Sequence, residues 1–288
     1  MKIGIPLFLL RHTQMAGVAQ RAEALGFESV WIPEHLVFPV RLTTPYPYSD
    51  DGEPPFTTDT PILDPLLLLT HIAAVTSRIR LGTNIFVLPL RHPLVVARLA
   101  MTLDVLSNGR LCFGVGAGWL EEEFRAVGVE FATRGSRLRE GVLALRALWT
   151  QSEPEFHGRF FDFGPLKFEP KPVQKPHPPI VFGGESERAM RRAAALGDGW
   201  YGVAHDPGSA REHVAKLRAM REAGGRADAP FEVTVGHRGG PLDADALRRY
   251  ADAGVDRVSV LPWSRGREAI EKLERLAEAV GRAGLDSN

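Results

Sequence analysis

Residues 79–116, IRLGTNIFVLPLRHPLVVARLAMTLDVLSNGRLCFGVG, decide the fold that the sequence predicts. An apolar run over Ile79–Val87 precedes a segment with helical spacing over Pro93–Ser107, and a second apolar run covers Arg110–Val115. Pro93 suits the first turn of a helix, where its missing N–H costs nothing, and Asn108-Gly109 suits the left-handed end of a helix. The stretch therefore predicts a strand, a helix and a second strand.

The same alternation of short apolar runs and amphipathic segments extends in both directions along the chain. Further strands are expected at Lys2–Phe8, Glu28–Pro33, Ile180–Phe182, Gly199–Val203, Glu232–Gly236 and Arg257–Leu261. Further helices are expected at Thr13–Leu25, Asp64–Ser77, Ser136–Trp149, Glu185–Leu196, Ser209–Ala223, Ala244–Ala253 and Arg267–Ala283. Gly197 and Ala253-Gly254 follow two of these helices, and we expect them to form left-handed caps.

Strand–helix units repeated in this way over 288 residues predict an α/β fold, the (β/α)8 TIM barrel, which takes roughly 250 residues before insertions. An open doubly wound sheet is the alternative, but it usually has fewer strands and, when it binds a dinucleotide, a glycine-rich turn after its first strand. Here the first strand runs into PLFLLRHTQ (residues 6–14), which contains no glycine. We therefore expect a single barrel domain over residues 1–288.

Composition excludes several classes of protein. Hydrophobic residues make up 44% and charged residues 24% of the chain, a balance typical of a globular domain. Lys+Arg and Asp+Glu both number 35, so nothing indicates a nucleic-acid partner. The apolar stretch near the N-terminus is too short to span a membrane and lacks a cleavage site. Since Cys112 is the single cysteine, no internal disulfide is possible, and we expect a cytoplasmic protein.

Two stretches interrupt the strand–helix rhythm. Residues 36–61 are rich in Pro, Tyr and Asp and have no period, whereas residues 152–179 contain alternating aromatics, typical of a hairpin, followed by a proline-rich run. Long loops inside a compact domain are usually lids or binding loops. We therefore expect both insertions to shape a substrate pocket, and their aromatic content hints at an apolar or aromatic substrate.

In a barrel, chemistry takes place where the strands end and the following loops begin. One strand ends at VWIPEH (residues 30–35), which places Glu34 and His35 side by side at the rim. A histidine there can take part in proton transfer. It can also be structural, locked by Glu34 or by a backbone carbonyl.

The strand end GVGAGWLEEEF (residues 114–124) carries glycines with period two, at Gly114, Gly116 and Gly118. They either leave one face bare for a flat molecule or relieve crowding inside the barrel. Trp119 then forms an aromatic wall or closes the core. The run Glu121–Glu123 is expected to be a solvated first helical turn.

A further strand end, FGGESERA (residues 182–189), places Gly183 and Gly184 before a helix that starts near Ser186. Free N–H groups and the helix dipole favour a phosphate at such a position. An ordinary N-cap explains the same residues, so both interpretations stay open.

Metal chemistry is not favoured by the sequence. Metal hydrolases on this fold typically bring a His-x-His pair from the first strand, whereas Arg11-His12 stands here. We therefore predict no metal site; a metal-dependent barrel hydrolase is the weakest alternative.

Taken together, the strand ends resemble the bacterial luciferase-like superfamily, and most closely its branch that uses the 8-hydroxy-5-deazaflavin coenzyme F420. The resemblance runs from Lys2 to about Trp263. It is carried by GFESVWIPEH (26–35), by residues 77–119 and by FGGESERAMRRAAALGDGWYG (182–202). This order and spacing are specific for the superfamily and much less specific for cofactor and substrate.

The resemblance implies a flavin or deazaflavin at the mouth of the barrel. His35 matches a histidine beside the reactive ring that handles protons or stabilises intermediates, and Glu34 would orient it. The Asn84–Ile85 peptide lies where the family often has a cis bond against the ring. Gly183, Gly184 and Ser186 match the phosphate-binding turn. The cofactor-binding residues implied in full are Thr83, Asn84, Ile85, Gly116, Ala117, Gly118, Trp119, Gly183, Gly184, Glu185, Ser186 and Trp200.

One departure and one agreement follow from the resemblance. Sugar-phosphate dehydrogenases of the deazaflavin branch carry a carboxylate where this chain has Trp119, and their substrate-phosphate lysines have no counterpart, so that activity is not implied. Dimers in the family pack through the second and third helices. The leucine-rich segment ILDPLLLLTHIAAV (62–75) suits such a homodimer interface.

These observations leave three functions open. The first is an F420-dependent oxidoreductase that moves hydride between the deazaflavin C5 and a small organic substrate. The second is an FMN-dependent monooxygenase, in which reduced flavin activates oxygen and His35 assists. The third, from another class, is a non-catalytic flavin-binding protein. The sequence does not identify the substrate.

Overall fold

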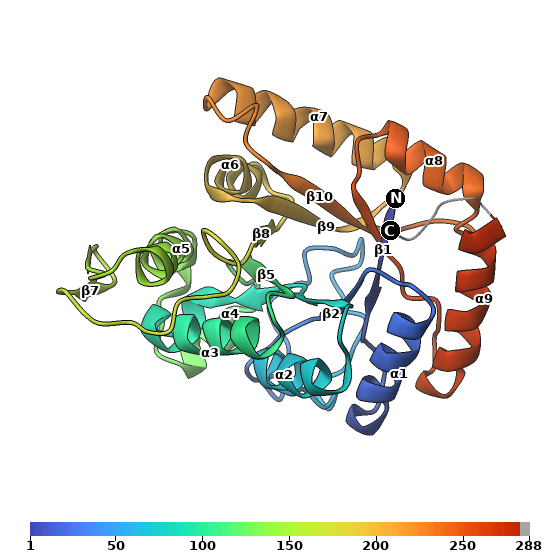
Figure 1. The fold of residues 1–288 in the computed structure, drawn as a ribbon, viewed down its shortest axis with the longest axis horizontal. Helices are drawn as coiled ribbons and strands as arrows, with labels where there is room; N and C mark the ends of the chain where they lie inside the picture. The colour runs from blue at the N-terminus through green and yellow to red at the C-terminus, as the bar shows by residue number, and fades with distance from the viewer. Residues whose placement is uncertain (283–288) are drawn as a thin grey trace.

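Eight parallel strands form a closed barrel in the computed structural model, which describes residues 1–282 (Figure 1). Each strand pairs with the next along the chain, and β11 pairs with β1 to close the ring. The barrel strands are β1 (Lys2–Pro6), β2 (Ser29–Ile32), β3 (Arg80–Thr83), β5 (Leu111–Gly116), β8 (Ile180–Gly183), β9 (Gly199–His205), β10 (Glu232–His237) and β11 (Arg257–Ser259). The barrel predicted from the repeated units is confirmed.

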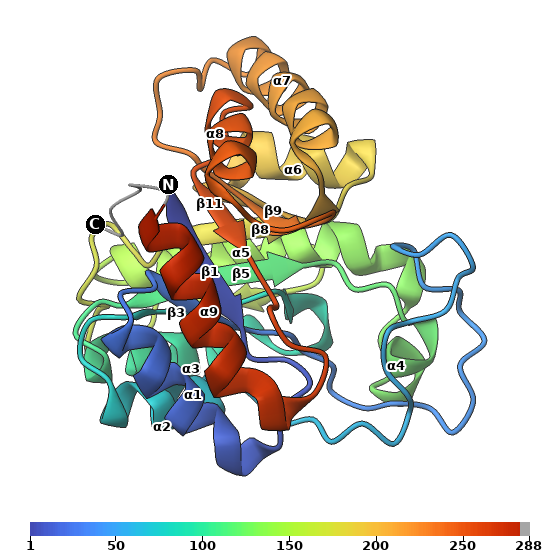
Figure 2. The same ribbon diagram turned by 90° about the vertical axis from the view of Figure 1, so that its right-hand side faces the viewer.

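Helices surround the barrel and connect successive strands (Figures 1 and 2). They are α1 (His12–Ala24), α2 (Pro65–Val75), α3 (Pro93–Leu106), α4 (Glu121–Ala126), α5 (Arg134–Thr150), α6 (Glu187–Leu196), α7 (Pro207–Ala223), α8 (Ala244–Asp252) and α9 (Ala269–Arg282). Short 3-10 turns lie at η1 (Leu88–Leu90), η2 (Phe131–Thr133) and η3 (Gly266–Glu268). The predicted last helix extends to Ala283, which lies outside the described residues.

Two local expectations are corrected by the structure. The predicted strand Ile79–Val87 is two strands, β3 and the short β4 (Phe86–Val87), and the Asn84–Ile85 peptide between them is cis. Gly109 and Gly254 have the expected positive φ, but Gly197 has φ −80° and is extended. An added Cβ at Gly197 would lie 2.6 Å from the carbonyl oxygen of Ala193, so this position needs glycine for space.

The interior of the barrel holds one large aromatic side chain from β2. Trp31 is fully buried, and bare backbone on the two neighbouring strands makes room for its indole. An added Cβ would lie 2.6 Å from the indole at Gly4 and 2.3 Å at Gly82. Arg257 is also fully buried and donates two hydrogen bonds of 2.7 Å to the carboxylate of Glu28. The same guanidinium forms an ion pair with Glu232, so the buried positive charge is compensated by two carboxylates, as a buried charge requires.

The two insertions lie at opposite ends of the barrel. Residues 36–61 follow β2 and therefore begin at the carboxyl ends of the strands; Figure 2 shows this blue segment beside α4, on the side to which β5 points. Residues 152–179 follow α5 and form the predicted hairpin, β6 (Phe156–His157) with β7 (Asp162–Phe163). The amide of Gln174 then donates to the carbonyl of Leu111, the first residue of β5, at 2.7 Å. The second insertion therefore covers the amino ends.

The helices can be compared with the length and hydropathy of a membrane span. Within residues 1–282, none of them combines the length and the apolar character that a bilayer crossing requires.

Candidate active site

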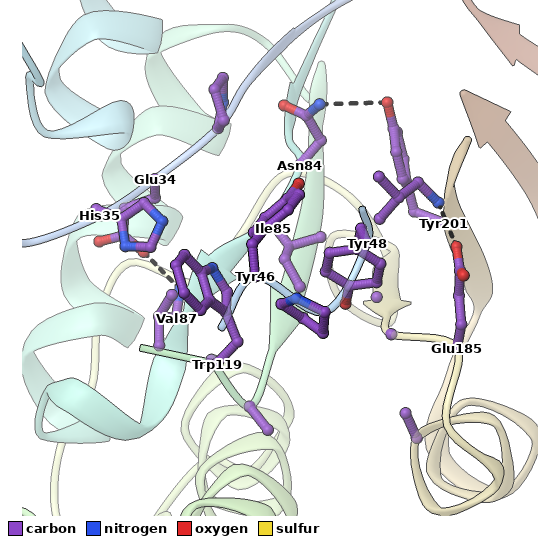
Figure 3. Close-up of a pocket in the computed structure, with 18 of the residues that line it drawn as sticks. Glu34, His35, Tyr46, Tyr48, Asn84, Ile85, Val87, Trp119, Glu185 and Tyr201 are labelled. Carbon is purple, nitrogen blue, oxygen red and sulfur yellow. Dashed lines mark hydrogen bonds between the residues drawn. The ribbon is translucent and has the colours of Figure 1, made fainter. Parts of the chain in front are cut away.

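A cavity of about 1080 Å³ lies at the carboxyl ends of the barrel strands (Figure 3). The ends of β2, β5, β8 and β9 contribute to its wall, and the 36–61 segment contributes aromatic and proline side chains. Among the described residues, none from 152–179 lines the cavity, so the expectation that this insertion shapes the pocket is wrong. A loop that follows a helix begins at the amino ends of the strands, and the cavity lies at the carboxyl ends.

His35 stands at the rim of this cavity and is held by a carboxylate from α4. Its Nδ1 lies 3.2 Å from Oε2 of Glu123, and the side chains of the two residues are 11% and 0% exposed. An ionised carboxylate accepts hydrogen bonds only, so Nδ1 carries the proton in this pair. Nε2 has no hydrogen-bond partner within residues 1–282 and is left for a molecule in the cavity.

Three aromatic rings surround the imidazole. Phe38, Phe56 and Trp119 have ring centroids 4.9, 5.6 and 5.6 Å from that of His35. Tyr46 contacts Trp119 edge to face at 5.2 Å and lies over the centre of the site in Figure 3. The surroundings of His35 are therefore apolar, and Trp119 forms a wall of the cavity as one interpretation of the sequence expected.

The first turn of α4 fastens the 36–61 segment to the barrel. Glu122 accepts hydrogen bonds from the backbone N–H and the hydroxyl of Thr43, at 2.7 and 2.5 Å, and likewise from Thr44, at 3.1 and 2.6 Å. Burial alone would raise the pKa of Glu122, but these hydrogen bonds lower it to about 2. Glu123 accepts from the N–H of Leu36. The expectation that the three glutamates are merely solvated therefore holds only for Glu121, which pairs with Arg125 on the surface.

Glu34 does not orient His35. Its carboxylate accepts the N–H of Val87 and pairs with the guanidinium of Arg91. Burial raises the pKa of Glu34 to about 7, and the charge of Glu123 adds to this, although Arg91 and the N–H of Val87 act in the opposite direction. Glu34, which directly precedes His35 in the chain, is thus a structural carboxylate of the rim, and Glu123 instead contacts the imidazole.

The floor of the cavity is formed by Ile85. Its side chain packs on bare backbone: an added Cβ would lie 1.9 Å from Ile85 Cδ1 at Gly116 and 2.5 Å from it at Gly183. Of the two interpretations of the glycine-rich strand, relief of crowding is confirmed, because Gly114 faces the carbonyl of Thr83 and Gly118 faces Val87 and Phe124. The glycines shape the floor indirectly, by letting Ile85 lie flat.

A polar group closes the floor next to Ile85. The amide of Asn84 donates to the hydroxyl of Tyr201 at 3.2 Å, as Figure 3 shows. The amide oxygen of Asn84, which lines the cavity, is buried without a hydrogen-bond partner among residues 1–282. Buried polar atoms without partners are costly, so this oxygen is a candidate contact for a bound molecule.

The predicted phosphate turn has the expected geometry. Gly184 has φ 104°, and Ser186 is the N-cap of α6, with its hydroxyl accepting the N–H of Ala189 at 3.3 Å. Trp200 lies behind this turn, fully buried, and its indole donates to the carbonyl of Gly184 at 2.9 Å. The turn is therefore fixed from the protein side, and Gly183, Gly184 and Ser186 line the cavity.

Glu185 lies at the far side of the cavity from His35 (Figure 3). Its carboxylate accepts the N–H of Val203 at 2.8 Å and lies 3.0 Å from Nε2 of His205. Burial would raise the pKa of Glu185, but the hydrogen bonds from His205 and Val203 lower it below its ordinary value. The carboxylate is thus held as an anion on this wall.

His213 lies close to this pair, a cluster that spacing in the sequence did not predict. Glu185, His205 and His213 offer metal-ligand atoms within 4.8 Å of one another. In the structure these groups make hydrogen bonds instead: Nδ1 of His213 lies 2.9 Å from the carbonyl of Ser209. The imidazole of His213 stacks on Trp200 at 5.6 Å, and Trp200 in turn holds the turn at Gly183-Gly184.

Most of the predicted site residues gather at this cavity. Its lining includes Glu34, His35, Asn84, Ile85, Ala117, Gly118, Trp119, Gly183, Gly184, Glu185 and Ser186. Thr83, Gly116 and Trp200 lie behind the wall: the Thr83 hydroxyl donates to the carbonyl of Gly114 at 2.6 Å, which keeps it in the barrel. Sequence reasoning missed Glu123 and Tyr201, because nothing distinguishes the third glutamate of a run or a tyrosine inside a strand.

Comparison with known proteins agrees with this geometry. The family model of the luciferase-like monooxygenases matches residues 11–240. An uncharacterized protein of Mycobacterium tuberculosis is 38% identical over 281 residues, 96% of this chain and 98% of the relative. The FMNH2-dependent dimethylsulfone monooxygenase of Pseudomonas putida is 30% identical over 214 residues, 73% of this chain, and this chain covers 54% of it. The structure of an F420-dependent secondary alcohol dehydrogenase, with an F420-acetone adduct, superposes with a TM-score of 0.78 at 19% identity and covers 99% of both chains.

Proposed function

Because the chain belongs to the luciferase-like monooxygenase family, whose members are oxidoreductases, we propose that it is an F420-dependent oxidoreductase. It transfers hydride between the deazaflavin C5 and a small organic substrate. The observation that carries the proposal is the placement of His35, held through Nδ1 by Glu123, at the rim of a large cavity whose floor is Ile85.

The residues of the cavity fit a flavin-type ring. Ligand pockets commonly measure roughly 300–1,000 Å³, and this cavity, at about 1080 Å³, has room for a cofactor and a small substrate together. Ile85 presents an apolar floor, and the unpartnered amide oxygen of Asn84 offers an acceptor beside it. The N-terminus of α6 after Gly183-Gly184 provides an anion site for a phosphate.

Residues of this chain would position the ring and control water and protons. When bound, the deazaflavin supplies the hydride chemistry itself. Asn84 and Ile85 would contact the ring, and the aromatic side chains of the 36–61 segment exclude water from the site. His35, with its proton at Nδ1, presents Nε2 as the group that accepts or returns a proton at the substrate oxygen.

The F420-dependent secondary alcohol dehydrogenase, matched over 99% of both chains, gives the deazaflavin proposal a neighbour of the same fold. Phe38, Phe56 and Tyr46 of the 36–61 segment line the cavity with aromatic rings, which supports an apolar or aromatic substrate.

An FMN-dependent monooxygenase is the second candidate. It is favoured by the 30% identity to an FMNH2-dependent enzyme over 73% of this chain. The apolar surroundings of His35 would suit oxygen chemistry equally, because they keep water from a reactive intermediate.

Titration of the purified protein with each cofactor distinguishes the two candidates. Trp119 lines the cavity, so its fluorescence reports binding of either ring. We expect coenzyme F420 to bind with a dissociation constant below about 1 μM and FMN to bind at least tenfold more weakly. Tight binding of FMN with none of coenzyme F420 would overturn the proposal in favour of the monooxygenase.

We also propose a homodimer that forms through α2 and α3. Of the four leucines in the α2 segment, Leu66, Leu68 and Leu69 are buried within the chain and Leu67 is 64% exposed. Exposed apolar residues on these two helices are Leu67, Val75, Val95, Val105 and Leu106. Apolar patches of this kind commonly mark interfaces between proteins. We further propose a cytoplasmic location for the protein.

A further inference from the structure

Four arginines line one side of the cavity, beyond the turn at Gly183-Gly184. Arg134 and Arg139 belong to α5, and Arg188 and Arg192 belong to α6. The α6 pair follows directly on the phosphate turn, whereas His35 stands at the opposite side of the cavity (Figure 3). The cluster therefore lies at the end of the site that is remote from the proposed chemistry.

The guanidinium groups from the two helices approach one another. Nη1 of Arg192 lies 3.1 Å from the position that a Cβ of Gly135 would take, at the start of α5. Burial lowers the pKa of Arg192, and the positive charges of Arg134 and Arg188 lower it further. Nε of Arg192 is buried without a hydrogen-bond partner among the described residues. Positive charges that repel one another in this way favour binding of an anion.

The chain supplies little negative charge to the cluster. Within residues 1–282, no carboxylate forms an ion pair with Arg139, Arg188 or Arg192. The neighbouring Arg191, on the outer face of α6, is paired with Glu187. Glu185 lines the same cavity, but its carboxylate is bound to His205 and to the N–H of Val203.

One of the four arginines, Arg134, already makes contacts within the protein. Arg134 donates to the carbonyl of Phe131 at 3.1 Å, and its guanidinium lies over the Phe131 ring at 3.8 Å. Burial lowers the pKa of Arg134, although the charge of Glu121 acts in the opposite direction. Arg139 and Arg188 are exposed and lead from the cavity to the surface. The arrangement is a positively charged path that begins at the phosphate turn and runs outward.

The charge of this path exceeds what one phosphate requires. The N-terminus of α6 already supplies free N–H groups for a phosphate. We infer that the four arginines bind a second anionic part of the cofactor, the chain of glutamate carboxylates that coenzyme F420 carries beyond its phosphate. Guanidinium groups bind carboxylates through paired hydrogen bonds, and such charge-assisted bonds are stronger than neutral ones. This inference rests on the proposed function and deepens it, since FMN has no such tail.

Binding measurements on the purified protein test the inference without an activity assay. Three ligands are compared by fluorescence titration at low salt: coenzyme F420 with several glutamates, the same molecule without glutamates, and FMN. We expect the wild type to bind the glutamate-bearing form about tenfold or more tightly than the glutamate-free form. In the double variant Arg139→Gln/Arg188→Gln this preference should fall to about twofold or less, with the affinity for the glutamate-free form unchanged. Arg191→Gln, on the same helix but outside the cavity, is the matched control and should keep the preference.

The outcomes separate this inference from the proposed function. Equal affinity of the wild type for the two deazaflavins overturns the inference and leaves the cofactor assignment intact. Equal weakening of both deazaflavins in the double variant also overturns it, because the arginines would then bind the phosphate alone. A double variant that keeps the wild-type preference for the glutamate-bearing form overturns the inference too, because Arg139 and Arg188 then do not bind the glutamate chain. Binding of FMN with no deazaflavin bound overturns both.

Discussion

Nδ1 of His35 and Oε2 of Glu123 lie 3.2 Å apart, although the residues are separated by 88 positions in the chain. The carboxylate comes from the first turn of α4, which follows β5, whereas the imidazole follows β2. A carboxylate behind an imidazole fixes the ring and its tautomer and stabilises the protonated ring. The pair therefore has the geometry of a positioned acid–base group.

His35 is expected to be essential for turnover and dispensable for binding. The substitution His35→Ala removes Nε2 from the rim, and we expect a loss of about 10²-fold or more in kcat. Glu123→Gln keeps the shape but weakens the hold on the ring, so kcat should fall about tenfold and the pH profile should shift. Turnover is followed by deazaflavin absorbance with a substrate that the wild type accepts. Unchanged activity and binding in His35→Ala would instead support a non-catalytic flavin-binding protein.

Glu34 should make stability depend on pH. Its folded pKa of about 7 lies above the ordinary value of 4.5, so the unfolded chain releases this proton first and the ionised carboxylate destabilises the fold. At about 1.4 kcal/mol per pH unit, the free energy of unfolding of the wild type, relative to Glu34→Gln, should fall by about 3 kcal/mol from pH 4.5 to pH 8. Urea unfolding at both pH values measures the difference. A difference that does not vary with pH would contradict the prediction.

Glu122 should control how tightly the 36–61 segment is closed. The substitution Glu122→Ala removes the acceptor of four hydrogen bonds from Thr43 and Thr44. Trypsin cleavage after the exposed Arg41 should become about tenfold faster, because local opening then costs less free energy. Glu121→Ala removes a carboxylate from the same turn whose ion pair within residues 1–282 is with Arg125, and it serves as the control. Equal cleavage rates in the two variants would show that the segment is fastened elsewhere.

Gly116 should affect the cofactor without touching it. An added methyl group at Gly116→Ala would overlap Cδ1 of Ile85, so the floor of the cavity must move. We expect a loss of about 1–3 kcal/mol in the free energy of unfolding and weaker cofactor binding. The double variant Gly116→Ala/Ile85→Val removes the overlapping atom and should restore both. Gly164→Ala, at a position with open space around it, is the control.

The oligomeric state depends on the exposed leucines of α2 and α3. Leu67 and Leu106 are 64% and 63% exposed, and we expect the wild type to have twice the 31.6 kDa mass of one chain. The double variant Leu67→Glu/Leu106→Glu should be monomeric, because a buried unpaired charge is costly at an interface. Light scattering after size exclusion measures the mass. Val40→Glu, on a loop residue that is 93% exposed, should leave the dimer intact.

The sequence predicted the barrel because its evidence is local. The apolar run Ile180–Phe182 and the helical spacing of Pro93–Ser107 can each be recognised from a short stretch of sequence alone. The structure has a strand and a helix at these positions. The glycines at the helix ends were predicted only in part. Asn108-Gly109 has the expected left-handed conformation. Gly197 is needed because a side chain would clash with the carbonyl of Ala193, a contact that no local sequence pattern reveals.

The candidate site was predicted only where it follows the strands. His35 and Asn84 follow β2 and β3, and Gly183 is the last residue of β8, so their position at the mouth follows from the fold. The prediction that residues 152–179 shape the pocket was wrong. Length and aromatic content indicate a binding loop, but this segment follows the helix α5 and therefore begins at the amino ends of the strands. The partner of His35 could not be predicted, since Glu34 is adjacent in sequence and Glu123 only in space.

One carboxylate serves two neighbours along the chain: Glu123 accepts the N–H of Leu36 and holds the ring of His35. Any displacement of the start of the 36–61 segment would therefore also release the imidazole. The position of this loop and the orientation of the ring are thus coupled through a single side chain.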